Sequence, residues 1–203
     1  MTDHFAVLGQ PRRPWLDADV LKEKFHQLSA AAHPDHVHNQ DADVRQQADA
    51  RYVELNAAYQ CLRHSKTRLE HLLQLESGSK PGDLRAIPDD RVQFFGEVGA
   101  LLRDTNGLIS EKAQVTSSIL RVGLLERAMP HLERISKLQE AIQTRLQTVT
   151  DELRALDRDW GECLRDPSRR AMALATSERL YHLFGFLERW AGQLQERSFQ
   201  LTV

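Results

Sequence analysis

Pro34 follows a stretch of sequence in which apolar residues recur at every third or fourth position, from Leu21 to Ala32. This spacing places them on one face of a helix, and Asp17, just before the stretch, is a residue type that commonly caps a helix start. Proline cannot donate a backbone hydrogen bond, and it disfavours the helical conformation of the residue before it. The sequence therefore predicts an amphipathic helix over residues 18–32 that ends just before Pro34.

A second and longer apolar stripe begins after the proline. It runs from Val44 to Leu62 at steps of three and four residues, which predicts a second helix packed antiparallel against the first. His33, Pro34 and Asp35 then lie in the turn between the two helices, at the tip of a helical hairpin. Because connecting turns are where binding residues concentrate, we interpret this tripeptide as a candidate binding site.

Helical spacing continues through the rest of the chain, so the predicted fold class is all-α. A short amphipathic segment over 69–75 ends at a turn-forming stretch, 77–82, which marks a domain boundary. We predict an amino-terminal domain over residues 1–76, a linker over 77–89 and a carboxy-terminal helical bundle over 90–203.

Turn-forming residues divide the bundle into helices. One helix is expected to begin after Asp90 and to bend or end at Asn106–Gly107. Apolar spacing resumes before Pro130, and a clean seam over Leu132–Trp160 is typical of a long helix with coiled-coil-like packing. A last helix follows Pro167. Such seams indicate mutual burial, so we assign most of these apolar residues to the core of the bundle.

The composition argues against several classes of function. A formal net charge of -2 gives no overall attraction to nucleic acid or to an anionic membrane, so neither is expected as a partner. No segment has the apolar length of a membrane span and the amino terminus lacks a targeting pattern, so we expect a cytoplasmic protein. Cys61 and Cys163 match neither a CxxC metal pair nor a disulfide framework, and we expect both to be small buried residues. Without a glycine-rich phosphate loop or a nucleophile–base arrangement, we expect neither an enzyme nor a bound cofactor.

Several blocks of the amino-terminal half resemble the J domain of the DnaJ family in their order and spacing. They are Asp3–Gly9, the amphipathic helix that follows, the tripeptide His33-Pro34-Asp35, and Leu55–Leu62. The continuation over Leu62–Leu73 is most similar to HscB, the branch of the family that acts in iron–sulfur cluster assembly. Members of that branch carry an amino-terminal J domain followed by a helical bundle, which is the organisation expected here.

The resemblance implies a co-chaperone that binds a DnaK- or HscA-type ATPase chaperone and stimulates its ATP hydrolysis. In the family the decisive contact is made by the tripeptide, here His33, Pro34 and Asp35. Lys22 and Lys24 on the preceding helix would meet an acidic patch of the chaperone and raise the encounter rate. Because this helix has fewer basic residues than many J domains, we expect a weaker and more salt-sensitive encounter with the same docking geometry.

The resemblance also implies a client, the iron–sulfur cluster scaffold protein, which the bundle would bind. In HscB the binding surface lies on the first bundle helix and on one face of the last. The matching positions here are Phe95, Glu97 and Leu102 in the first helix and Phe186 in the last. Two glycines near Phe95 replace bulky residues of the family, so a J-domain co-chaperone with a different client is the alternative.

Histidines around the turn suggest one further alternative. His33, His36 and His38, with His26 on the preceding helix, could hold zinc or another divalent ion. Their spacing matches no established site and no closed set of ligands is visible, so no metal site is predicted. A metal-binding helical protein without a chaperone partner is kept as the third and least favoured hypothesis.

Overall fold

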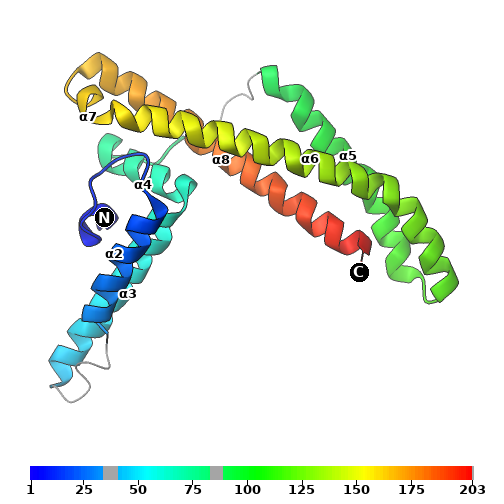
Figure 1. Ribbon diagram of the computed structural model, residues 1–203, viewed down its shortest axis with the longest axis horizontal. Helices are drawn as coiled ribbons and strands as arrows, with labels where there is room; N and C mark the ends of the chain where they lie inside the picture. Colours follow the sequence, from blue (N-terminus) through cyan, green and yellow to red (C-terminus); the bar gives the residue numbers. More distant parts are fainter. Residues whose placement is uncertain (34–40, 83–88, 203) are drawn as a thin grey trace. The chain divides into compact units, whose positions relative to one another are not determined.

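The computed structural model describes residues 1–33, 41–82 and 89–202 of the chain (Figure 1). Every regular element within these ranges is a helix, which confirms the predicted all-α fold class. The helices are α1 (His4–Val7), α2 (Ala18–Ala31), α3 (Ala42–Arg63), α4 (Ser65–Ser77), α5 (Asp89–Gln114), α6 (Ser118–Arg158), α7 (Trp160–Cys163) and α8 (Pro167–Thr202). None of these helices, over the residues described, has both the length and the apolar character needed to cross a membrane.

The helices form two compact units, and each unit draws on two separate parts of the chain. The first contains Met1–Gly82 together with Asp151–His182, and the second contains Asp83–Thr150 together with Leu183–Val203. The division therefore falls inside α6 and inside α8. Each domain predicted from the sequence is one uninterrupted stretch of chain, whereas each of these units combines two separate stretches. The domain boundaries at residues 76 and 90 stay a prediction.

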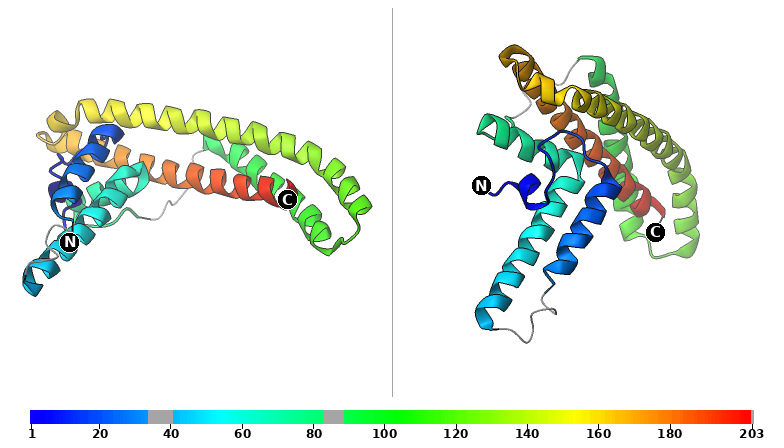
Figure 2. Two further views of the ribbon diagram at one scale, coloured as in Figure 1. Left: turned by 60° about the horizontal axis from the view of Figure 1, so that its bottom comes forward. Right: turned by 60° about the vertical axis from the view of Figure 1, so that its left-hand side comes forward.

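In the first unit, α2 and α3 lie antiparallel and side by side, as the apolar stripes predicted (Figures 1 and 2). Asp17 caps α2 as expected, because its carboxylate accepts hydrogen bonds from the backbone N–H groups of Asp19 and Val20 at 3.0 Å. Between the helices, the rings of Phe25 and Tyr59 stack with their centroids 4.3 Å apart. The tip of the hairpin, residues 34–40, lies outside the described residues.

Polar contacts bind residues 151–182 to the amino-terminal part of the first unit. The buried carboxylate of Asp157 accepts hydrogen bonds from the Arg13 side chain, with Nε at 2.8 Å, and from the backbone N–H of Trp15 at 3.1 Å. The Trp160 indole N–H donates to the carbonyl of Arg12 at 3.0 Å, and its ring joins the apolar core. This segment is thus part of the same core as the hairpin.

Arg68 is the most buried of the charged side chains that hold the first unit together in this way. Its side chain is 3 % exposed, and it donates to the carbonyls of Pro14 and Leu62 at 2.7 Å and to the Ser65 hydroxyl at 3.2 Å. Burial lowers the pKa of Arg68 to about 10. The guanidinium therefore joins the start of α4 to the end of α3 and to the loop before α2 by satisfying buried carbonyl groups.

The second unit contains α5 and the adjoining parts of α6 and α8, which contact one another in pairs. Lys112 of α5 donates from Nζ to the carbonyls of Gln200 and Leu201 in α8 at 3.2 and 3.0 Å. Between α6 and α8, the Gln139 amide donates to the Gln195 side chain at 3.2 Å. The bundle is therefore held at its helix ends as well as by its apolar core.

Two predicted helix boundaries in this unit are wrong. Asn106–Gly107 neither ends nor interrupts α5, which continues to Gln114, and Pro130 lies inside α6, which already begins at Ser118. A single glycine costs an α-helix only about 1 kcal/mol, and the buried Leu101 and Thr105 hold α5 in place just before Gly107.

The apolar seam of α6 explains why Pro130 does not end the helix. Ala128, Ile135, Ile142 and Val149 are all buried and follow one another at seven-residue steps. The seam thus begins before the proline, and burial on both sides of Pro130 offsets the hydrogen bond that it cannot make. Other apolar residues assigned to the core are exposed: Ile119, Val122, Leu125 and Met172.

Candidate functional site

His33 lies immediately beyond the end of α2, where the sequence predicted the start of the docking turn. It is half-buried, its N–H donates to the carbonyl of Ala30 at 3.3 Å, and its ring meets Tyr52 of α3 edge-on with centroids 5.6 Å apart. The ring contact with Tyr52 places the imidazole of His33 against α3. Pro34 and Asp35, the other two members of the tripeptide, lie outside the described residues.

The two lysines predicted to assist docking have different surroundings on α2. Lys22 is exposed, as an encounter residue must be. Lys24 is half-buried, and its side chain passes so close to Gly9 that a Cβ added to this glycine would lie 3.7 Å from Lys24 Cε. Residues two apart on a helix do not share a face. The structure therefore separates the two lysines, and Lys22 is the better placed for a partner.

In the second unit, the two phenylalanines predicted to bind a client lie in direct contact. The ring of Phe95 on α5 is 5.6 Å from that of Phe186 on α8, and both are half-buried. Trp190, one turn after Phe186, completes the group, at 4.2 Å from Phe95 and 5.9 Å from Phe186. We call Phe95, Phe186 and Trp190 the aromatic patch.

A charged group borders the aromatic patch, and the other predicted client-binding residues lie at different places on α5. The guanidinium of Arg189 lies 5.7 Å from the ring centre of Phe186, a cation–π distance. Glu97 is exposed and two residues from Phe95, so it lies on a different side of α5. Leu102 is half-buried seven residues, or two helical turns, after Phe95, which continues the same face.

Sequence reasoning did not assign Trp190 and Arg189 to this patch. Trp190 was placed in the core of the last helix by the apolar spacing, and it is instead half-buried beside two half-buried phenylalanines. The sequence does place Trp190 four residues after Phe186, and residues four apart are neighbours on a helix surface, so this spacing could have assigned Trp190 to the patch.

The cysteines differ from expectation, since both are half-buried free thiols instead of fully buried ones. Of the histidines considered as metal ligands, His36 and His38 lie outside the described residues. Among the described residues, ligand atoms suited to a metal ion converge elsewhere, at His4, Cys61 and His71.

The fold of the chain is found in solved structures. No family model matches the sequence. The chaperone HscB from Vibrio cholerae superposes with a TM-score of 0.61 at 18% sequence identity, covering 98% of this chain and 99% of that one. The human co-chaperone protein HscB gives a TM-score of 0.59 at 18% identity, covering 98% of this chain and 81% of that one. The predicted resemblance is confirmed at the level of the fold: this chain has the fold of the HscB co-chaperones.

Proposed function

We propose that this protein is a J-domain co-chaperone of the HscB type, which stimulates the ATPase of a DnaK- or HscA-type chaperone. The observation that carries the proposal is the α2–α3 hairpin, with His33 directly beyond the end of α2 and held against Tyr52. The similarity of the fold to two HscB structures, over nearly the whole chain, also supports the proposal. The protein itself would catalyse no reaction, since it acts by docking onto the partner's ATPase.

The chemistry of the tripeptide suits docking. Asp35 can form a charge-assisted hydrogen bond with a cationic group of the chaperone, and Pro34 restricts the turn so that little conformational entropy is lost on binding. Lys22, exposed on α2, adds attraction to an acidic surface and acts mainly on the association rate.

We further propose that the aromatic patch binds the client, with the iron–sulfur cluster scaffold protein as the leading candidate. Phe95, Phe186 and Trp190 combine large apolar area with partial exposure, which is the character of residues that dominate the energy of protein interfaces. Arg189 beside the patch supplies a charged group of the kind found at the polar rim of such interfaces. The human and Vibrio cholerae structures support this role only by their shared fold.

A different client is the second candidate, and one observation favours it. The first turns of α6 expose Ile119, Leu120, Val122 and Met129, each more than half exposed. An apolar surface of this kind is typical of an interaction site for another protein. The chaperone partner would be unchanged in this case.

Steady-state ATPase measurements separate these hypotheses. Purified DnaK-type chaperones from the same organism are assayed with the wild-type chain, with His33→Gln, and with added scaffold protein. We expect stimulation by the wild type, its loss in His33→Gln, and further stimulation when scaffold protein is present. Stimulation without synergy from the scaffold protein favours another client, and no stimulation of any chaperone overturns the co-chaperone proposal.

A further inference from the structure

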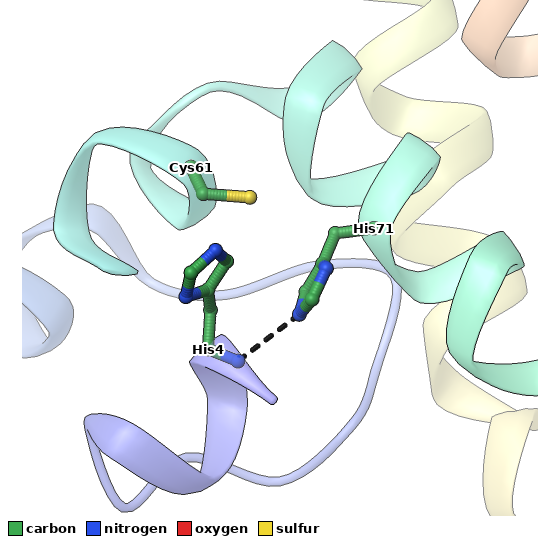
Figure 3. Close-up of side chains that lie close together, drawn as sticks. All are labelled: His4, Cys61 and His71. Carbon is green, nitrogen blue, oxygen red and sulfur yellow. Dashed lines mark hydrogen bonds between the residues drawn. The ribbon is translucent and has the colours of Figure 1, made fainter. Parts of the chain in front are cut away.

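Three side chains from three different helices converge at the end of the hairpin opposite to its tip. His4 begins α1, Cys61 lies in the last turn of α3, and His71 lies in the middle of α4 (Figure 3). One ring nitrogen from each histidine and the sulfur of Cys61 all lie within 4.8 Å of one another. His71 is buried, while His4 and Cys61 are half-buried. Imidazole and thiolate are the donor groups that zinc prefers in proteins.

The surrounding contacts fix all three residues in place. The Asp3 carboxylate caps α1 by accepting the N–H of Phe5 at 3.0 Å, and the Thr67 hydroxyl donates to the carbonyl of Cys61 at 2.5 Å. The ring centroids of His4 and His71 lie 4.5 Å apart, and the Phe5 ring stacks on His71 with centroids 5.8 Å apart. These ligands are therefore positioned by the fold before any ion is bound, which reduces the entropy cost of binding.

The spacing is close to that of a metal centre. With bonds of about 2.0–2.3 Å, neighbouring ligand atoms of a tetrahedral zinc site lie about 3.3–3.6 Å apart. The three atoms here lie within 4.8 Å of one another, so the largest closure required is about 1.5 Å. Small side-chain rotations supply a movement of this size without a change in the helices.

Burial sets the protonation of the group in the absence of an ion. It lowers the pKa of His4 and of His71, for the latter with help from the neighbouring His4, which favours the neutral rings that can act as ligands. Burial and the charge of Glu70 raise the pKa of the Cys61 thiol to about 11. In binding a cation, Cys61 would lose its S–H proton to solvent as the sulfur–metal bond forms.

Hydrogen bonding leaves the two histidines differently satisfied. Nδ1 of His4 is buried and makes no hydrogen bond within the described part of the chain, which is uncommon for a buried polar atom. Nε2 of His71 accepts a hydrogen bond from the backbone N–H of His4 at 3.0 Å, so its ring proton is on Nδ1 (Figure 3). An ion that binds Nε2 of His71 takes the place of the His4 backbone N–H. An ion that binds Nδ1 instead moves the ring proton to Nε2, which can then no longer accept a hydrogen bond. In both cases the hydrogen bond from the His4 backbone N–H to His71 is lost.

We propose that His4, Cys61 and His71 form a binding site for a divalent cation of the zinc class. Three protein ligands leave one position of a tetrahedral ion open, and Cys61 and His71 line an open pocket, together with Glu70 and Gln74, through which an ion or water can enter. The site joins α1 and α4 to the end of α3, so a bound ion stabilises this part of the first unit. It is separate from the tripeptide and does not depend on the proposed co-chaperone function.

Cobalt and zinc titrations of the full-length, tag-free chain test the site. Under reducing conditions, the metal-free protein is titrated with Co²⁺ and then competed with Zn²⁺. We expect one ion per chain, with the intense visible bands of tetrahedral Co²⁺ and a sulfur-to-cobalt charge-transfer band. Loss of a residue that only hydrogen-bonds to a metal ligand costs roughly 10–100-fold in metal affinity. Loss of the ligand itself should cost more, so Cys61→Ser should raise Kd by about 100-fold or more. Cys163→Ser, the matched control at the other free thiol, should leave Kd unchanged.

A second variant separates ligation from folding. His71→Gln keeps an oxygen that can accept the His4 amide, so the fold is retained while the imidazole is removed. We expect an unchanged far-ultraviolet circular dichroism spectrum, loss of the Co²⁺ bands, and loss of the rise in melting temperature that Zn²⁺ gives the wild type. Absence of Co²⁺ bands in the wild type, or their persistence in both Cys61→Ser and His71→Gln, would overturn the proposal. So would loss of binding in the combined variant His33→Gln/His36→Gln/His38→Gln, which would place the ion at the hairpin tip.

Discussion

The two units of the molecule differ in how their polar and apolar groups are used. In the first, buried polar groups such as Arg68 and Asp157 have several hydrogen-bond partners each, and these tie separate segments into one body. In the second, Phe95, Phe186 and Trp190 are half-buried and lie against one another. The difference fits the proposed roles, in which buried hydrogen bonds support the hairpin and the aromatic patch binds a client.

The largest effect is expected from Arg68, the buried cation of the first unit. Arg68→Met leaves the carbonyls of Pro14 and Leu62 buried without a donor, and each such group costs about 1–3 kcal/mol. We expect the free energy of unfolding to fall by roughly 3–5 kcal/mol in urea denaturation followed by circular dichroism. The exposed Arg63 serves as the control, and Arg63→Met should change stability by no more than about 0.5 kcal/mol. An Arg68→Met protein as stable as the wild type would contradict the description of a rigid first unit.

Asp157 tests the link between residues 151–182 and the amino-terminal part of the chain. Asp157→Ala removes the acceptor for Arg13 and for the partly buried backbone N–H of Trp15, and we expect a loss of about 2–3 kcal/mol. The exposed neighbour Asp159 gives a matched control, because its side chain makes no capping hydrogen bond. Equal effects of Asp157→Ala and Asp159→Ala on the melting transition would show that this segment packs less tightly than described.

The aromatic patch should behave in the opposite way, with a larger effect on binding than on folding. Phe186→Ala removes the ring that contacts both Phe95 and Trp190, and we expect client affinity to fall by about 2 kcal/mol, or roughly 30-fold. Phe199, which is 61% exposed on the same helix, is the control, and Phe199→Ala should leave affinity unchanged. Calorimetric titration with the scaffold protein measures both variants. A loss of stability as large as that of Arg68→Met would place Phe186 in the core and remove the contrast between the units.

The smallest effect is expected at Lys22. Because exposed charges act mainly on encounter, Lys22→Ala should slow association with the chaperone by about two- to threefold at low salt and have no effect at high salt. Lys137→Ala, at an exposed lysine of the second unit, should not change the rate. A change confined to the dissociation rate would mean that Lys22 lies inside the docked interface.

Local patterns in the sequence predicted the local structure well. Asp17, the apolar spacing and Pro34 gave α2 to within one residue, and the family resemblance selected Phe95 and Phe186, which prove to be in contact. Periodicity tells which face of a helix is buried, but it does not tell what covers that face. It could not show that Trp160 packs into the same core as the hairpin.

The same limit applies to the turn signals and to the proposed metal site. The predicted long helix began at Leu132, after Pro130, yet burial on both sides of the proline retains α6, and such tertiary packing is not visible in local propensity. Cys61 and His71 lie on consecutive helices, but His4 comes from the start of the chain, and only the fold brings the three together, so no spacing rule could have found them.

Single-turnover ATP hydrolysis by the partner chaperone tests the central claim most directly. The chaperone loaded with ATP is mixed with a saturating amount of the wild-type chain, of His33→Gln, or of His64→Gln as an exposed-histidine control from the same unit. We predict that the wild type and His64→Gln accelerate hydrolysis equally, and that His33→Gln leaves it near the unstimulated rate although the variant is fully folded. Equal acceleration by His33→Gln and the wild type would contradict the account.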